Sequence, residues 1–132
     1  MDSQAFNLKL ARLRASHEAL VTRRNRIDPQ HDNGIVDRYV NPVLTADHTP
    51  MHWRYDLNPE TNPYLMERMG INGVYNAGAI ELDGITYLIC RVEGYDRKSF
   101  FAVAESRTGI DTFRFWDRPL VMPETEDPDI NV

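Results

Sequence analysis

Residues 85–93 carry apolar side chains on both of the faces that a β-strand presents. Alternation places Ile85, Tyr87 and Ile89 on one face and Leu88, Cys90 and Val92 on the other. Such a strand is stable only where other apolar groups cover both faces. The segment therefore predicts a sheet that is covered on two sides, and this requirement limits what the chain can fold into.

The chain after Gly73 reads as a meander of four antiparallel strands, because period-two and apolar runs alternate with turn residues. The expected strands are residues 74–82, 85–93, 99–106 and 113–116. Asp83-Gly84 suits a two-residue type I′ turn, since both positions need a positive φ that these residues tolerate. The links at 94–98 and 107–112 complete the predicted meander.

The residues before the meander supply little to cover it. Apolar side chains at three- and four-residue steps predict a helix over residues 4–22, capped by Asp2 or Ser3; its stripe is Phe6, Leu10, Leu13, His17, Leu20 and Val21. Five prolines make residues 25–72 irregular. Only an edge strand over Ile35–Val40 and one helical turn over Tyr64–Met69 are expected there.

A sheet with two apolar faces needs more cover than one narrow helix and a proline-rich segment provide. Four-stranded meanders that stack around an axis are the blades of a β-propeller. The sequence holds one such meander and no second copy. We therefore expect an all-β propeller, of which residues 1–132 are the amino-terminal part: a helix and linker (1–30), a proline-rich segment (31–73), and the first blade with an acidic tail (74–132).

Composition excludes several classes of protein. The chain has 132 residues, a net charge of −5 and a mean hydropathy of −0.51, and no apolar run approaches the roughly 20 residues of a membrane span. One cysteine and no secretory leader favour the cytoplasm. The acidic balance argues against nucleic acid as a partner. Residues 1–27 carry six basic against two acidic residues, so this helix is a candidate for contacts between subunits of a homo-oligomer.

Two positions in the expected sheet stand out as candidates for ligand binding. Asn76 opens a run of small residues, Asn76–Ala79, that lets a ligand or another chain approach the backbone closely; tight contact between blades is the alternative. Arg91 and Glu93 end the second strand as a charged pair. Arg91 offers a planar fork of donors suited to sugar hydroxyls or an oxyanion, whereas a structural ion pair is the other interpretation.

A loop and an aromatic cluster add further candidates. Asp96, Arg97 and Lys98 form a dense polar loop between two buried strands, which is typical of a binding element as well as of a solvated turn. Arg54 lies between Trp53 and Tyr55, and flat rings beside a cation suit stacking on a sugar, although both aromatics are also ordinary core residues. His48 and His52 do not predict a metal site, because Pro50 interrupts the helix that would align them.

Longer strings of sequence carry a specific resemblance. They are 41–45, 48–50, 53–58, 60–63, 76–79, 91–94, 96–106, 109–111 and 113–116. Together they resemble the inverting β-mannoside phosphorylases of glycoside hydrolase family 130, over nearly the whole chain.

This resemblance implies a five-bladed propeller in which inorganic phosphate attacks the anomeric carbon of a mannosyl residue. The products from 4-O-β-D-mannosyl-D-glucose would be α-mannose 1-phosphate and glucose, with phosphate as co-substrate and no metal or organic cofactor. The general acid would be an aspartate in a Tyr-Asp-Met-Arg motif shortly after Asn131-Val132, so no catalytic residue is expected in this chain. The substrate-binding candidates would be Asn76, Arg91, Glu93, Asp96, Arg97, Lys98 and Arg54.

Three alternatives stay open at this point. A related β-1,4-mannooligosaccharide phosphorylase or mannoside hydrolase fits the same residues. A non-catalytic sugar-binding or assembly module is a different class, and the product of an interrupted gene is a third. The sequence does not distinguish acceptor sugars, and the chain alone is expected to be inactive.

Overall fold

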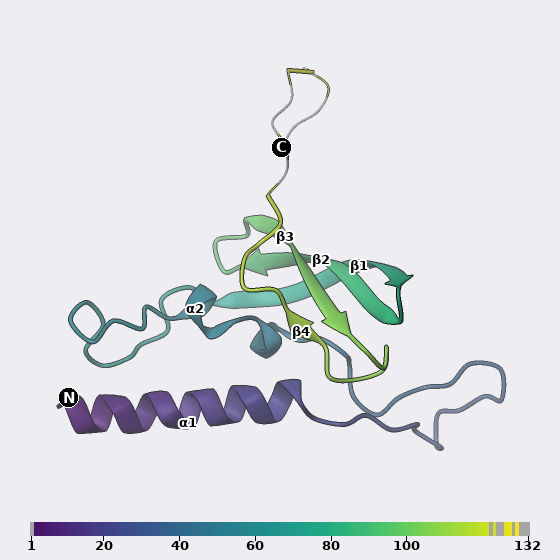
Figure 1. Ribbon diagram of the computed structural model, residues 1–132, viewed down its shortest axis with the longest axis horizontal. Coiled ribbons are helices and arrows are strands. Elements are labelled where there is room, and N and C mark those ends of the chain that lie inside the picture. The colour runs from purple at the N-terminus through teal and green to yellow at the C-terminus, as the bar shows by residue number, and fades with distance from the viewer. Residues whose placement is uncertain (1, 122, 124–125, 128, 130–132) are drawn as a thin grey trace.

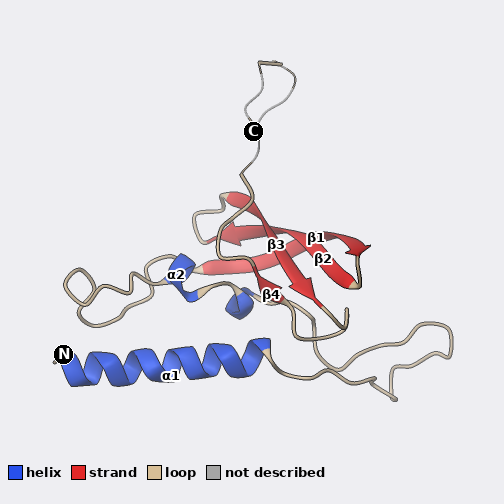
Figure 2. Ribbon diagram, viewed as in Figure 1, coloured by secondary structure: helices blue, strands red, loops and turns tan. Residues whose placement is uncertain are grey.

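The computed structural model describes residues 2–121, 123, 126–127 and 129. In chain order the elements are α1 (Ser3–Val21), η1 (Ala46–His48), α2 (Met51–Arg54), β1 (Ile71–Leu82), β2 (Ile85–Gly94), β3 (Ser99–Ser106) and β4 (Arg114–Phe115) (Figure 1). Helix and sheet both contribute to the described part of the chain, so the expected all-β class is too narrow (Figure 2). None of the helices in this part combines the length and the apolar character needed to cross a membrane.

The predicted meander is confirmed. The four strands form one antiparallel sheet in the order β1-β2-β3-β4. At the first turn Asp83 and Gly84 have φ of 53° and 79°, as a type I′ turn requires, and Leu82 pairs with Ile85. β4 is shorter than expected, because only two of its residues pair with β3.

The amino-terminal helix is also confirmed, to within a residue at each end. The Asp2 carboxylate accepts a hydrogen bond from the Ala5 N–H at 2.7 Å and caps α1. Phe6 and Val21 are buried at the two ends of its apolar stripe. Lys9 Nζ donates to the Tyr64 carbonyl, and Arg114 pairs with Glu18 at 2.9 Å, so α1 is tied to distant parts of the chain.

The edge strand expected over Ile35–Val40 is wrong. Only one β-bridge forms there, between Ile27 and Tyr39, and Ile35 is 88% exposed. The Asn33 side chain accepts hydrogen bonds from the N–H groups of Ile35 and Val36. These local bonds satisfy the backbone in a turn, in competition with a strand ladder.

The helical turn expected over Tyr64–Met69 is wrong as well. Leu65 adopts a φ of 49°, which a right-handed helix does not allow, and the Asn62 side chain bonds to both the N–H and the carbonyl of Met66. Glu67 instead forms a bridge with Tyr55. The short helices of this region lie earlier, in η1 and α2, on either side of Pro50.

The two faces of the sheet have different surroundings. On one side, which we call the covered face, η1, α2 and the segment before them lie against the strands, with α1 beyond (Figure 1). The buried cluster on this side is Ile71, Cys90, Val92, Ala102, Ala104, Phe113 and Phe115, with Trp53, Leu88 and Phe100 packed against it.

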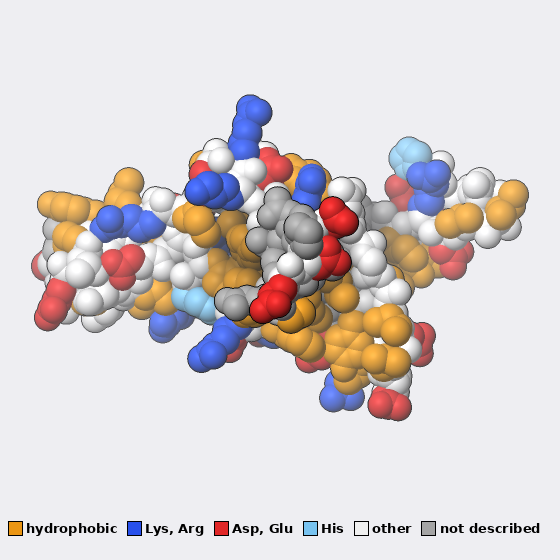
Figure 3. All heavy atoms as spheres, turned by 90° about the horizontal axis from the view of Figure 1, so that it is seen from above, with side chains coloured by type: hydrophobic (Ala, Val, Ile, Leu, Met, Phe, Trp, Pro, Cys, Tyr) orange, Lys and Arg blue, Asp and Glu red, His pale blue; other side chains and the backbone are white. Residues whose placement is uncertain are grey.

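The opposite side, which we call the open face, leaves large apolar side chains exposed to solvent. The strand registers and the ring contact between Tyr87 and Trp116 place on it Tyr75, Ile80, Leu82, Ile89, Phe101 and Trp116, which are 38–53% exposed. Figure 3 shows hydrophobic side chains gathered on the side of the molecule away from α1. Within the described residues, the predicted requirement for cover is therefore met on one face only.

Candidate functional site

Asn76 lies in a bulge of β1. The register shifts between the pair Tyr75 and Arg91 and the pair Gly78 and Ile89, and Asn76 takes a φ of 53° there. Its side chain is exposed and makes no hydrogen bond to any residue that the structure describes. A Cβ placed on Gly78 would have no heavy atom within 4 Å. The small residues of this strand thus leave open space beside the backbone.

Arg91 lies on β2 directly opposite Tyr75. Its guanidinium carbon is 5.3 Å from the centre of the Tyr75 ring, a cation–π contact. Nε is buried without a hydrogen-bond partner, and the guanidinium forms no ion pair within the described part of the chain. A half-buried cation without a carboxylate partner retains donors for a ligand.

Glu93 does not pair with Arg91. Its carboxylate accepts a hydrogen bond at 2.9 Å from Asn72 Nδ2, across the strand pair at the start of β1. The structural ion pair considered from the sequence is therefore not formed in this structure. Glu93 instead bonds to a side chain at the start of β1.

Asp96, Arg97 and Lys98 form a tight turn between β2 and β3. The Asp96 carboxylate accepts from the Lys98 N–H at 3.0 Å, and Arg97 adopts a φ of 64° while its N–H donates to the Gly94 carbonyl at 2.9 Å. All three side chains are exposed. The hairpin connecting β2 and β3 places this loop at the same end of the strands as Glu93.

Two tyrosines that the sequence interpretation missed lie against glycines in this region. A Cβ on Gly73 would be 2.4 Å from the Tyr75 hydroxyl oxygen, and one on Gly70 would be 2.0 Å from a Tyr95 ring carbon. Each ring therefore occupies the space that a side chain on the glycine would need. The Gly-x-Tyr spacing of Gly73 and Tyr75 was a usable signal, because residues two apart share a strand face.

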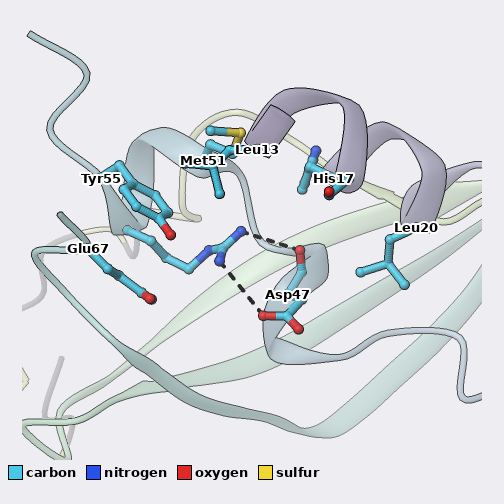
Figure 4. Close-up of a pocket in the computed structure, with 9 residues that line it drawn as sticks. Leu13, His17, Leu20, Asp47, Met51, Tyr55 and Glu67 are labelled. Carbon is cyan, nitrogen blue, oxygen red and sulfur yellow. Dashed lines mark hydrogen bonds and ion pairs between the residues drawn. The ribbon is translucent and has the colours of Figure 1, made fainter. Parts of the chain in front are cut away.

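Arg54 lies apart from the other candidates, in a pocket between α1 and α2 (Figure 4). The pocket has a volume of about 290 Å³. Arg54 Nη1 is 3.8 Å from the Asp47 carboxylate, and its guanidinium carbon lies 5.7 Å from the centre of the Tyr55 ring. Burial, followed by the nearby Glu67 carboxylate, raises the pKa of Tyr55. The structure thus groups Arg54 with acidic and apolar side chains on the covered side of the sheet.

The neighbours of Arg54 have structural partners. Trp53 packs edge-on against Phe100 at 5.4 Å between ring centres, and its Nε1 donates to the Asp117 carbonyl. His48 Nδ1 accepts from the Thr45 N–H at 2.9 Å, and burial lowers the pKa of His48 to about 4. His52 contacts the Asp117 carbonyl through Nε2. Trp53 is thus a core residue, as the alternative interpretation had it.

Comparison with known proteins adds a close relative. The chain is 59% identical over 127 residues to the 4-O-beta-D-mannosyl-D-glucose phosphorylase of Bacteroides fragilis. The match covers 96% of this chain and 32% of the relative, so the chain spans about a third of the length of that protein. No protein-family model matches the chain. The similarity expected from the sequence strings is confirmed for this segment.

Proposed function

We propose that this chain is the amino-terminal part of an inverting phosphorylase that acts on 4-O-β-D-mannosyl-D-glucose. The observation that carries the proposal is the 59% identity to a mannosylglucose phosphorylase over 96% of the chain. At this identity over nearly the whole chain, a shared fold and a shared sugar are the simplest expectation. The exposed Asn76 and the unpaired Arg91 donors agree with a role in holding hydroxyl groups.

The reaction proposed is a single displacement. A phosphate oxygen forms a bond to the mannosyl anomeric carbon, the bond from that carbon to glucose O4 breaks, and glucose O4 takes up a proton. The products are α-mannose 1-phosphate and glucose. The phosphate dianion needs positive groups and the leaving oxygen needs an acid; we assign both to polypeptide beyond Val132, so the chain alone is expected to be inactive.

We further propose that the sheet is one blade of a five-bladed propeller. Support comes from the simple meander order β1-β2-β3-β4 and from the apolar open face, both of which suit stacking against a neighbouring blade. In this arrangement Asn76, Arg91, Glu93 and the Asp96–Lys98 loop line the sugar site from the first blade. Arg54 is the least favoured candidate because it lies on the covered side.

The test uses the full natural polypeptide that contains this segment. Incubated with mannosylglucose, it should release mannose 1-phosphate only when inorganic phosphate is supplied. Equal sugar release without phosphate would indicate a hydrolase, and faster turnover of β-1,4-mannooligosaccharides would indicate the related phosphorylase. Binding of mannosides without turnover would contradict the proposal and favour a sugar-binding module.

A matched pair of variants tests the site. Arg91→Lys keeps a positive charge but loses the planar fork of donors. We expect it to raise the KM for mannosylglucose about ten-fold, while Arg107→Lys, at an exposed position beyond β3, leaves it unchanged. An unchanged KM in Arg91→Lys would remove Arg91 from the proposed site.

A further inference from the structure

Arg91 has little to hold its side chain in one direction. The guanidinium makes no hydrogen bond or ion pair within the described part of the chain, where it contacts the Tyr75 ring. An arginine side chain loses rotamer entropy when it is fixed. A guanidinium that is oriented before the ligand binds loses less of this entropy on binding. In this structure the group that can orient the Arg91 guanidinium is the Tyr75 ring.

Gly73 leaves the space that the Tyr75 ring occupies. The two residues lie two apart on β1 and therefore share a face of the sheet, as their partners Glu93 and Arg91 do on β2. A Cβ on Gly73 would be 2.4 Å from the Tyr75 hydroxyl oxygen and 2.5 Å from its Cζ. Carbon atoms do not approach so closely, so the ring can lie along the strand only while residue 73 has no side chain.

We propose that Tyr75 is a positioning residue for Arg91, and that Gly73 provides the space in which its ring lies. This inference rests on the proposed function for the role of Arg91 in sugar binding. The ring faces the cation, holds the guanidinium on the open face and leaves its N–H groups directed to a ligand. Asn76 follows Tyr75 directly in β1, at the bulge, while Arg91 lies opposite Tyr75 on β2.

The first test measures Arg91 directly and does not need activity. Phenylglyoxal modifies exposed guanidinium groups, and peptide mass spectrometry can follow the rate at Arg91 in the full natural polypeptide. Tyr75→Leu should speed this reaction about five-fold, the factor expected for a contact of about 1 kcal/mol. Tyr75→Phe, which keeps the ring, should not, and neither should Tyr64→Leu, which removes an exposed tyrosine elsewhere. An unchanged rate in Tyr75→Leu would overturn the proposal.

The second test connects this geometry to the sugar. Tyr75→Leu should raise the KM for mannosylglucose about five-fold and leave the KM for phosphate unchanged, while Tyr75→Phe stays within two-fold of the natural protein. A merely structural role would instead lower the melting temperature without this selective KM effect. A Tyr75→Phe variant as weak as Tyr75→Leu would overturn the proposal, because the hydroxyl would then be the group that matters.

A double-mutant cycle tests the part played by Gly73. Gly73→Ala should displace the ring and reproduce the effect of Tyr75→Leu on both measurements. Combining Gly73→Ala with Tyr75→Leu should add nothing further, because the ring is already absent. Additive effects would show that Gly73 acts independently and would overturn its assignment. If the natural protein turns over no mannosylglucose, the proposed function fails, while the labelling rates still decide whether Tyr75 holds Arg91.

Discussion

The two faces of the sheet are lined by similar residues but differ in what lies against them. On the covered face Phe115 is 5% exposed, enclosed with Trp53 and the strand residues around it. On the open face Phe101 is 44% exposed. The amino-terminal half of the chain thus covers one face, and the other face is left exposed within the described residues.

The difference also separates structural from candidate functional residues. On the covered face Trp53 of α2 has a ring partner in Phe100 of β3 and a hydrogen-bond partner in the Asp117 carbonyl. On the open face the Arg91 guanidinium contacts the Tyr75 ring, and its Nε has no hydrogen-bond partner within the described residues. An apolar surface on a sheet face marks an interface, and Arg91 lies on this face between Tyr75 and Phe101.

The largest difference in stability should come from making the same Phe→Ala substitution on each of the two faces. Phe115→Ala should lower the free energy of unfolding of the 132-residue chain by about 3–5 kcal/mol, because it leaves a cavity in the core. Phe101→Ala should cost about 1 kcal/mol, because the ring is only half buried. Urea unfolding at low protein concentration measures both. Equal losses would contradict the distinction between the faces.

A second comparison tests whether the open face mediates self-association of the chain. Replacing Ile80 and Ile89 by Lys should weaken self-association of the 132-residue chain at least about ten-fold, since both side chains are half exposed there. Leu8→Lys on α1 is the matched control, because Leu8 is exposed to the same degree as Ile80. Sedimentation velocity measures the association. A similar effect of both changes would remove the open face as its cause.

The smallest effect concerns His48 on the covered side. Its folded pKa of about 4 lies below the ordinary value of 6.5, because burial and then Arg23 and His17 disfavour the charged ring. The unfolded state therefore binds the proton more readily, and stability should fall as the pH drops from 6.5 towards 4. The melting temperature should decrease by a few degrees over this window, and His48→Gln should flatten the decrease. An unchanged slope in His48→Gln would assign the effect to other groups.

The sheet was predictable because its signals are local. Asp83-Gly84 determines a turn type, and alternation determines which residues of β2 share a face. The segment between α1 and β1 was not predictable in the same way. Ile35 and Leu65 carry strand and helix propensity, but side chains such as Asn33 and Asn62 bond to the nearby backbone and override it.

The candidate site was predictable in its residue types and less so in its arrangement. Asn76 and Arg91 stand out as polar residues in apolar strands, and the structure brings them to one region of the sheet. The register shift that leaves Asn76 in a bulge, and the Tyr75 ring over Arg91, depend on pairing between distant residues. Arg54 differs from both: its sequence neighbours suggested a sugar contact, which stays a prediction, and the fold places it beside Asp47.

Solvent access at residue 89 tests most directly whether further protein covers the open face. A thiol is introduced by Ile89→Cys in a Cys90→Ala background, and its labelling rate is measured in the 132-residue chain and in the full natural polypeptide. We expect rapid labelling in the shorter chain and on the order of a hundred-fold protection in the longer one, as for a buried cysteine. Equally rapid labelling in both would contradict it.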